Sequence, residues 1–177
     1  DIPCSRELGA LWKFALGLER ARGKPAKTIE RPDYNFTIEG SGDEARVTIA
    51  ERSRGTPLDK LVAELMIAVN STWGKLLDDR DVAAIYRVQS VGKVRMTTSA
   101  MAHQGLGISH YAWTSSPLRR YVDLVNQWQM LALLQGVPPP FSRNSDLMLS
   151  AVHDFEATHA AYDEFQRRME RYWCLRW

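Results

Sequence analysis

The sequence predicts an α+β fold in which long helices pack on a mostly antiparallel sheet. Three observations predict it: a helical pattern over residues 5–22, two alternating segments around a glycine-rich turn at residues 40–43, and two long helical patterns after residue 116. Hydrophobic residues make up 45% of the 177 positions and charged residues 25%, which is typical of a globular domain with a hydrophobic core.

The first segments follow local signals. Apolar residues recur at helical spacing over residues 5–22, and Gly23 and Pro25 end this helix. Residues 34–38 and 45–49 alternate between apolar and polar side chains around the turn, which predicts a β-hairpin.

A long helix follows the hairpin. Thr56 and Pro57 are typical of a helix start, and the helical pattern extends to about Leu77. Short strands are then expected over residues 83–88 and 94–98. The apolar face of this helix is expected to carry Leu58, Leu61, Leu65, Val69 and Trp73.

Two further helices complete the chain. Ser116 and Pro117 are expected to open a helix that runs to about Leu134. Asn144 or Ser145 caps the last one. The aromatic run over residues 172–177 suits a strand that enters more structure, so we expect the chain to be part of a longer polypeptide. The core face of the last helix is expected to carry Leu149, Val152, Phe155, Tyr162, Phe165, Met169 and Tyr172.

The charge balance limits what can support a nucleic-acid hypothesis. The net charge is only +2, from 23 basic and 21 acidic residues, so a local basic patch would have to carry such binding. No apolar run approaches the roughly 20 residues of a membrane helix. Cys4 and Cys174 show no Cys-x-x-Cys pattern, which favours reduced thiols in a cytoplasmic protein.

Two adjacent arginines follow Ser116 and Pro117. If a helix starts there, Arg119 and Arg120 lie in its first turn and oppose the helix dipole, which costs a few tenths of a kcal/mol unless an anion binds. Free backbone amides, serine hydroxyls and guanidinium groups together form a phosphate site. Asp123 lies within reach of either arginine, so a surface arginine–aspartate cluster without a ligand remains the alternative.

Residues 111–125 read Tyr-Ala-Trp-Thr-Ser-Ser-Pro-Leu-Arg-Arg-Tyr-Val-Asp-Leu-Val. They resemble the signature of the ribonuclease II and ribonuclease R family, whose catalytic RNB domain carries Tyr-Ala…Thr-Ser-Pro-Ile-Arg-Arg-Tyr-x-Asp-Leu. Residues 61–70, 85–89 and 105–107 resemble three further stretches of that domain in the same order. The resemblance implies that residues 1–177 are the C-terminal half of an RNB catalytic domain.

The family's members are 3′→5′ hydrolytic exoribonucleases that release nucleoside 5′-monophosphates and use magnesium. The resemblance implies that Arg119 is catalytic, because it matches the arginine that contacts the phosphate near the scissile bond. A cation there stabilises the charge of the transition state. Glu64 matches a glutamate near the 3′-terminal ribose, whose 2′-hydroxyl it can recognise.

Other side chains are expected to contact single-stranded RNA, the expected partner. For Tyr111 and Trp113 a place in the core is the alternative, for Glu64 an exposed helical position, and for the arginines a solvated surface. The expected RNA-binding residues are Glu64, Arg120, Ser116, Tyr111, Arg87 and His103.

The chain departs from the family pattern at a few positions. Gln127 and Trp128 replace a common His-Arg pair, and Gln89 replaces a common histidine. Neither change falls on Arg119 or Glu64, so the expected chemistry is retained while substrate preference is left open.

The family's aspartate cluster, which holds Mg²⁺, would lie upstream of this chain. Asp78, Asp79 and Asp81 are interpreted as a solvated loop, so no metal site is expected here. The chain alone is therefore expected to be inactive. Its working partner would be the upstream half of the same polypeptide or a complementary chain, and a C-terminal OB-fold would follow it. A non-catalytic RNA-binding module with an RNB-like fold, and a helical interaction domain without RNA, remain the alternatives.

Overall fold

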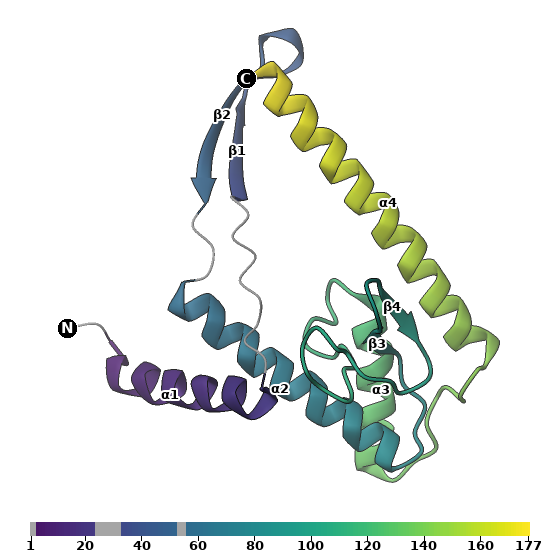
Figure 1. The fold of residues 1–177 in the computed structure, drawn as a ribbon. Coiled ribbons are helices and arrows are strands. Elements are labelled where there is room, and N and C mark those ends of the chain that lie inside the picture. The colour runs from purple at the N-terminus through teal and green to yellow at the C-terminus, as the bar shows by residue number, and fades with distance from the viewer. Residues whose placement is uncertain (1–2, 24–32, 53–55) are drawn as a thin grey trace.

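The computed structural model describes residues 3–23, 33–52 and 56–177. Within these ranges the chain forms four α-helices and two separate pairs of antiparallel strands, which confirms the α+β class (Figure 1). The strands form two antiparallel pairs rather than one continuous sheet. None of the described helices is long and apolar enough to cross a membrane.

The first helix and the hairpin follow the local signals. Helix α1 spans Ser5–Arg22 and ends at Gly23, whose φ of 68° is left-handed and therefore suits glycine. Strand β1 (Asp33–Glu39) pairs with β2 (Arg46–Arg52), and a short 3-10 turn over Gly42–Glu44 connects them. Pro25, expected to end α1, lies outside the described residues.

Helix α2 spans Pro57–Asp79, and its expected start is confirmed. The Thr56 hydroxyl accepts a hydrogen bond from the Asp59 backbone N–H at 3.2 Å, and the Asp59 carboxylate accepts one from the Thr56 N–H at 3.2 Å.

The predicted buried face of α2 is only partly correct. Leu58 and Val69 are exposed, whereas polar Glu64 and Asn70 are fully buried. The apolar pattern misplaced the face because Glu64 and Asn70 find polar partners inside the protein. The residues that are buried along α2 are Leu61, Glu64, Ile67, Asn70, Gly74 and Leu77.

Strands β3 (Tyr86–Gln89) and β4 (Val94–Thr97) form the second hairpin. The strand predicted from residue 83 starts only at Tyr86, because side chains of another helix take the backbone hydrogen bonds before it. Ile85 N–H donates to the Asn126 side chain at 2.8 Å, and Ala83 C=O accepts from Gln129 at 2.8 Å.

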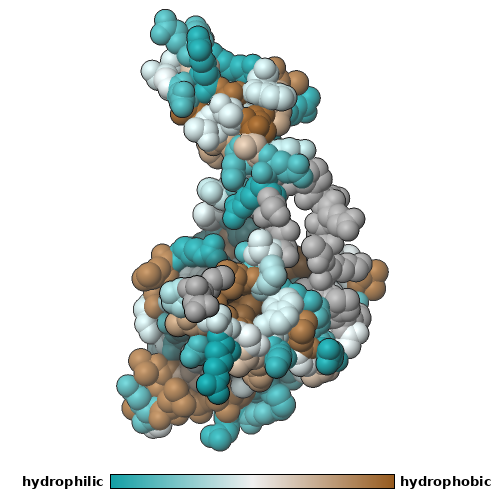
Figure 2. Space-filling view, turned by 90° about the vertical axis from the view of Figure 1, so that its left-hand side faces the viewer, coloured by the Kyte–Doolittle hydropathy of each residue, from teal (hydrophilic) through white to brown (hydrophobic). Residues whose placement is uncertain are grey.

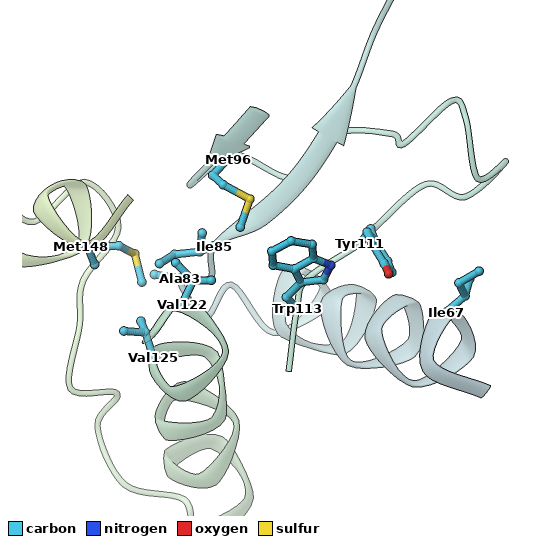
Figure 3. Close-up of a cluster of buried hydrophobic side chains, with 10 residues drawn as sticks. Ile67, Ala83, Ile85, Met96, Tyr111, Trp113, Val122, Val125 and Met148 are labelled. Atoms are coloured by element: carbon cyan, nitrogen blue, oxygen red, sulfur yellow. The ribbon is translucent and has the colours of Figure 1, made fainter. Parts of the chain in front are cut away.

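Figure 3 shows the main core cluster around residues 83–85. Its buried members are Ile67, Ala83, Ile85, Met96, Tyr111, Trp113, Val122, Val125, Met148 and Ala151.

Helix α3 spans Tyr121–Gln135, so the predicted start at Ser116 and Pro117 is wrong. Ser116 C=O accepts from the N–H groups of Arg119 and Arg120 at 3.2 and 3.1 Å, which closes a separate turn. The Ser116 N–H donates to the Asp123 carboxylate at 2.8 Å. Arg119 and Arg120 therefore precede the helix instead of occupying its first turn.

Helix α4 spans Asp146–Arg176, and Ser145 caps it through the Met148 N–H at 3.4 Å. The strand expected over residues 172–177 is wrong, because the helix continues to Arg176. In Figure 1, α4 leaves the core and reaches the tip of the β1–β2 hairpin.

The expected core face of α4 is wrong for most of its length. The buried residues of α4 are Met148 and Ala151, both in its first two turns, whereas Tyr162, Phe165 and Tyr172 are exposed. Figure 2 shows hydrophobic residues among hydrophilic ones on the lobe that the hairpin and the end of α4 form.

Replacing Asn126 with Leu should lower the free energy of unfolding by about 3 kcal/mol or more, because three buried backbone groups lose their partner. Asn126 is fully buried and bonds to both polar groups of Ile85 and to the Trp113 C=O. Urea denaturation followed by circular dichroism measures the change. Gln135→Leu, on an exposed position of the same helix, is the control and should change stability by less than about 0.5 kcal/mol. Equal effects of the two substitutions would contradict the assigned role.

Candidate functional site

The segment that leads to the two arginines is held against α2 by the side-chain amide of Asn70. The Asn70 Oδ1 atom accepts hydrogen bonds from the Thr114 N–H at 3.0 Å and from its hydroxyl at 2.8 Å. The Asn70 carbonyl accepts from the Ala112 N–H at 3.2 Å. A Cβ on Gly74 would lie 3.0 Å from the Ala112 nitrogen, so the close approach of α2 favours glycine there.

Helix α3 holds the same segment from the other side. The Asn126 side chain donates to the Trp113 C=O at 2.9 Å, and the Gln127 side chain donates to the Thr114 C=O at 2.7 Å. Gln127, which departs from the family pattern, therefore helps to fix this segment. The other departure, Trp128, stacks on Phe141 with ring centroids 6.1 Å apart.

Arg120 is paired with a buried carboxylate. Asp123 is fully buried and accepts two hydrogen bonds from the Arg120 guanidinium, at 2.8 and 2.7 Å. It also accepts the Ser116 N–H, so one carboxylate fixes both the turn and the arginine. The arginine–aspartate pair considered from the sequence is thus present at Arg120.

Arg119 differs from its neighbour. Its side chain is exposed, and its guanidinium donates to the Ser116 hydroxyl at 3.5 Å, a long hydrogen bond. No carboxylate of the described residues lies at ion-pair distance from it. Arg119 is therefore a cation that is free to meet an anion.

Both arginines line a groove of about 840 Å³ between this segment and the first half of α4. An adjoining hollow of about 340 Å³ carries Arg87 and Arg95 on its strand side. The α4 side of these spaces carries the carboxylates Asp154, Glu156 and Asp163. The residues shared by both spaces are Trp113, Phe155, His159 and Asp163.

The groove and the adjoining hollow together contain several of the predicted residues. Arg119 and Arg120 lie in the larger space, and Arg87 lies in the smaller one. Burial lowers the pKa of Arg87; the positive charge of Arg120 lowers it further, while Tyr111 and Asp163 raise it.

Tyr111 and His103 are buried next to each other. Their ring centroids are 5.5 Å apart in an edge-to-face arrangement, and Tyr111 belongs to the core cluster. Burial, and then the charge of Arg87, lower the pKa of His103. The His103 Nδ1 atom is buried without a hydrogen-bond partner among the residues that the structure describes. Tyr111 therefore lies in the core, as the alternative to RNA binding predicted. RNA contacts of Tyr111 and His103 remain predictions.

Glu64 lies apart from the groove and is paired with a residue that the sequence did not single out. Arg22 of α1 donates from Nε to the Glu64 carboxylate at 3.2 Å, makes a second contact with it, and donates to the Leu106 C=O at 2.7 Å. The alternative of an exposed helical glutamate is wrong, because Glu64 is fully buried. The only sequence signal for Arg22 is its place in the last turn of α1. A separate pocket of about 340 Å³ includes both Arg22 and Glu64 in its lining.

Asp78, Asp79 and Asp81 do not form a magnesium site with one another. Asp78 pairs with His110, Asp79 with Lys75 and Asp81 with Arg143, so these three carboxylates do not converge. Asp78 and Asp79 end α2 instead of following it. Within residues 3–23, 33–52 and 56–177, no group of three or more potential ligands could hold a metal ion.

The fold and the signature segment both match RNB-type ribonucleases. Residues 89–136 match the RNB domain model. The Dss1 exoribonuclease of Candida glabrata has a TM-score of 0.80 with this chain at 19% identity, over 99% of this chain and 27% of its own. Mycoplasma genitalium RNase R, solved with double-stranded RNA, has a TM-score of 0.78 at 16% identity, over 98% and 42%. The fold is therefore that of RNB exoribonucleases.

Curated relatives agree with the structural neighbours. An uncharacterized ribonuclease of Synechocystis sp. is 26% identical over 180 residues, which cover 87% of this chain and 26% of that protein. The human 3′-5′ exoribonuclease HELZ2 is 39% identical over 67 residues, or 37% of this chain and 2% of its own. The predicted resemblance to the RNB family is thus confirmed, and the chain spans about a quarter or less of these relatives.

Replacing Arg22 with Ala should lower the free energy of unfolding by about 3–5 kcal/mol, because it leaves the Glu64 carboxylate buried without its partner. Chemical denaturation monitored by tryptophan fluorescence provides the measurement. Adding Glu64→Gln to Arg22→Ala should recover part of the loss. Arg20→Ala, which removes an exposed arginine of the same turn, serves as the control and should have little effect. A small effect of Arg22→Ala would show that the pair is not important for stability.

Proposed function

We propose that this chain supplies the arginine-bearing half of a 3′→5′ exoribonuclease site that hydrolyses single-stranded RNA to nucleoside 5′-monophosphates. One observation carries the proposal: Arg119 lies in the wall of a groove without a carboxylate partner among the described residues, while the adjacent Arg120 is held by Asp123. A relative named as a 3′-5′ exoribonuclease and an RNase R solved with RNA support this interpretation of the groove.

The proposed chemistry follows from the charges. Phosphodiester hydrolysis places additional negative charge on the phosphate oxygens in the transition state, and a fixed cation beside them lowers its energy. The planar Arg119 guanidinium can donate two hydrogen bonds to one phosphate. Ser116 contacts Arg119 through its hydroxyl and is tied through its N–H to Asp123, so it orients this arginine.

The two paired residues take supporting roles in this proposal. Arg120 contributes its charge beside the RNA backbone while Asp123 fixes its orientation. Glu64 lines a separate pocket, where its carboxylate could accept a hydrogen bond from a ribose hydroxyl at the 3′ end. Arg22 holds that carboxylate in place.

The remaining chemistry is proposed to come from outside the chain. Magnesium, if the enzyme uses it, would be held by carboxylates of the upstream half of the same polypeptide or of a complementary chain. This fits the separate pairing of Asp78, Asp79 and Asp81. On this view residues 1–177 form the C-terminal half of the catalytic domain and are inactive alone.

In the natural polypeptide that contains these residues, Arg119→Ala should lower the release of monophosphates from a single-stranded RNA by about 100-fold or more, because the variant cannot stabilise the charge of the transition state. Single-turnover assays with 5′-labelled RNA measure the rate. Arg80→Ala removes the same charge from an exposed position after α2 and should leave the rate nearly unchanged.

Two results would overturn the proposal. A rate for Arg119→Ala within about twofold of wild type would reject the catalytic role of Arg119. Salt-dependent RNA binding by the natural polypeptide without any turnover would favour the non-catalytic RNA-binding module.

A further inference from the structure

The indole ring of Trp113 contacts two guanidinium groups. The Arg87 Cζ atom is 4.1 Å from the ring centroid and the Arg120 Cζ atom is 3.9 Å from it. Trp113 is only 7% exposed and lies in the buried cluster beside Tyr111 (Figure 3). Phe155 of α4 packs edge-to-face against the ring at 6.1 Å.

Trp113 offers little surface to a nucleotide base, because it is buried and two guanidinium groups lie over its ring. Base stacking needs an open aromatic face, and the Arg87 and Arg120 cations take up the ring of Trp113. The negative faces of an indole attract cations, so the ring can hold two like charges close together. Trp113 is therefore a spacer between charges and not a stacking platform.

The two cations that Trp113 contacts are not equivalent. Asp123 offsets the charge of Arg120 through two hydrogen bonds. Arg87 has no carboxylate at ion-pair distance in the described parts of the chain. Its backbone is fixed, because its N–H donates to the Tyr111 C=O at 2.7 Å, and its side chain reaches the smaller hollow. The contact of its guanidinium with the Trp113 ring fixes where this charge lies.

We propose that Trp113 is a positioning residue that holds the Arg87 guanidinium as a second phosphate-binding cation, beside the one at Arg119. The inference rests on the proposed function, because it assumes that RNA enters the groove. Arg119 lines the larger space and Arg87 the smaller one, and Trp113 lines both. The strand pair and the signature segment would thus bind two separate phosphates of one RNA strand.

The salt dependence of RNA binding tests this role, because its steepness depends on how many phosphates the protein neutralises. For a single strand, the slope of log K against log salt decreases by about 0.7 for each phosphate that is no longer neutralised. In the natural polypeptide, Arg87→Gln and Trp113→Leu should each reduce the slope by about 0.7. Trp113→Phe keeps an aromatic face and should preserve the slope. Trp113→Leu added to Arg87→Gln should cause no further reduction.

The outcomes separate this inference from the proposed function. A merely structural Trp113 would lower the melting temperature without changing the slope for folded protein, and that result would overturn the inference. If Trp113→Leu does not fold, an unchanged slope for Arg87→Gln, or a reduced slope for Trp113→Phe, would overturn it. Absence of salt-dependent RNA binding by the unmutated polypeptide would instead reject the proposed function.

Discussion

Buried carboxamide groups are the constraint on which the rest of this site depends. Residues 112–114 lie between two helices, where their polar backbone groups need partners away from water. Asn70 from one helix and Asn126 from the other supply them, and Asn126 also satisfies both polar groups of Ile85. A network of this kind fixes one geometry, because a shift of the segment would leave several buried groups unpaired at once.

The fixed segment determines which of two adjacent arginines is free. Asp123 is buried at the start of α3 and takes up both the Ser116 N–H and the Arg120 guanidinium. A buried carboxylate without a partner would lower the stability of the fold, so Arg120 stays paired with Asp123. Arg119, one residue earlier, lines the groove, and its guanidinium donates a long hydrogen bond to the Ser116 hydroxyl. The different pairing of the two arginines thus follows from one buried charge.

Sequence patterns correctly predicted features that depend on neighbouring residues. They failed for features that depend on residues distant in the sequence. The bounds of α1 and the capping box of α2 depend on neighbouring residues, and the starts of these two helices and the end of α1 were predicted. The start of α3 was misplaced because the Asp123 carboxylate reaches back seven residues to Ser116. The burial of Glu64 depends on Arg22, which lies 42 residues away in the sequence, so no helical pattern could reveal it.

The two walls of the groove differ in charge, and this limits how a polyanion could lie in it. The signature segment and β3 carry Arg119 and Arg87, which have no carboxylate partner among the described residues, whereas α4 carries Asp154 and Asp163. Phosphates would therefore be attracted to the first wall and repelled by the second. In the proposed complex, the backbone of an RNA strand faces the arginines and its ribose or base edges face α4. Carboxylates accept hydrogen bonds from hydroxyl and amino groups. The carboxylates of α4 would therefore face ribose hydroxyls and base amino groups, which they can bind.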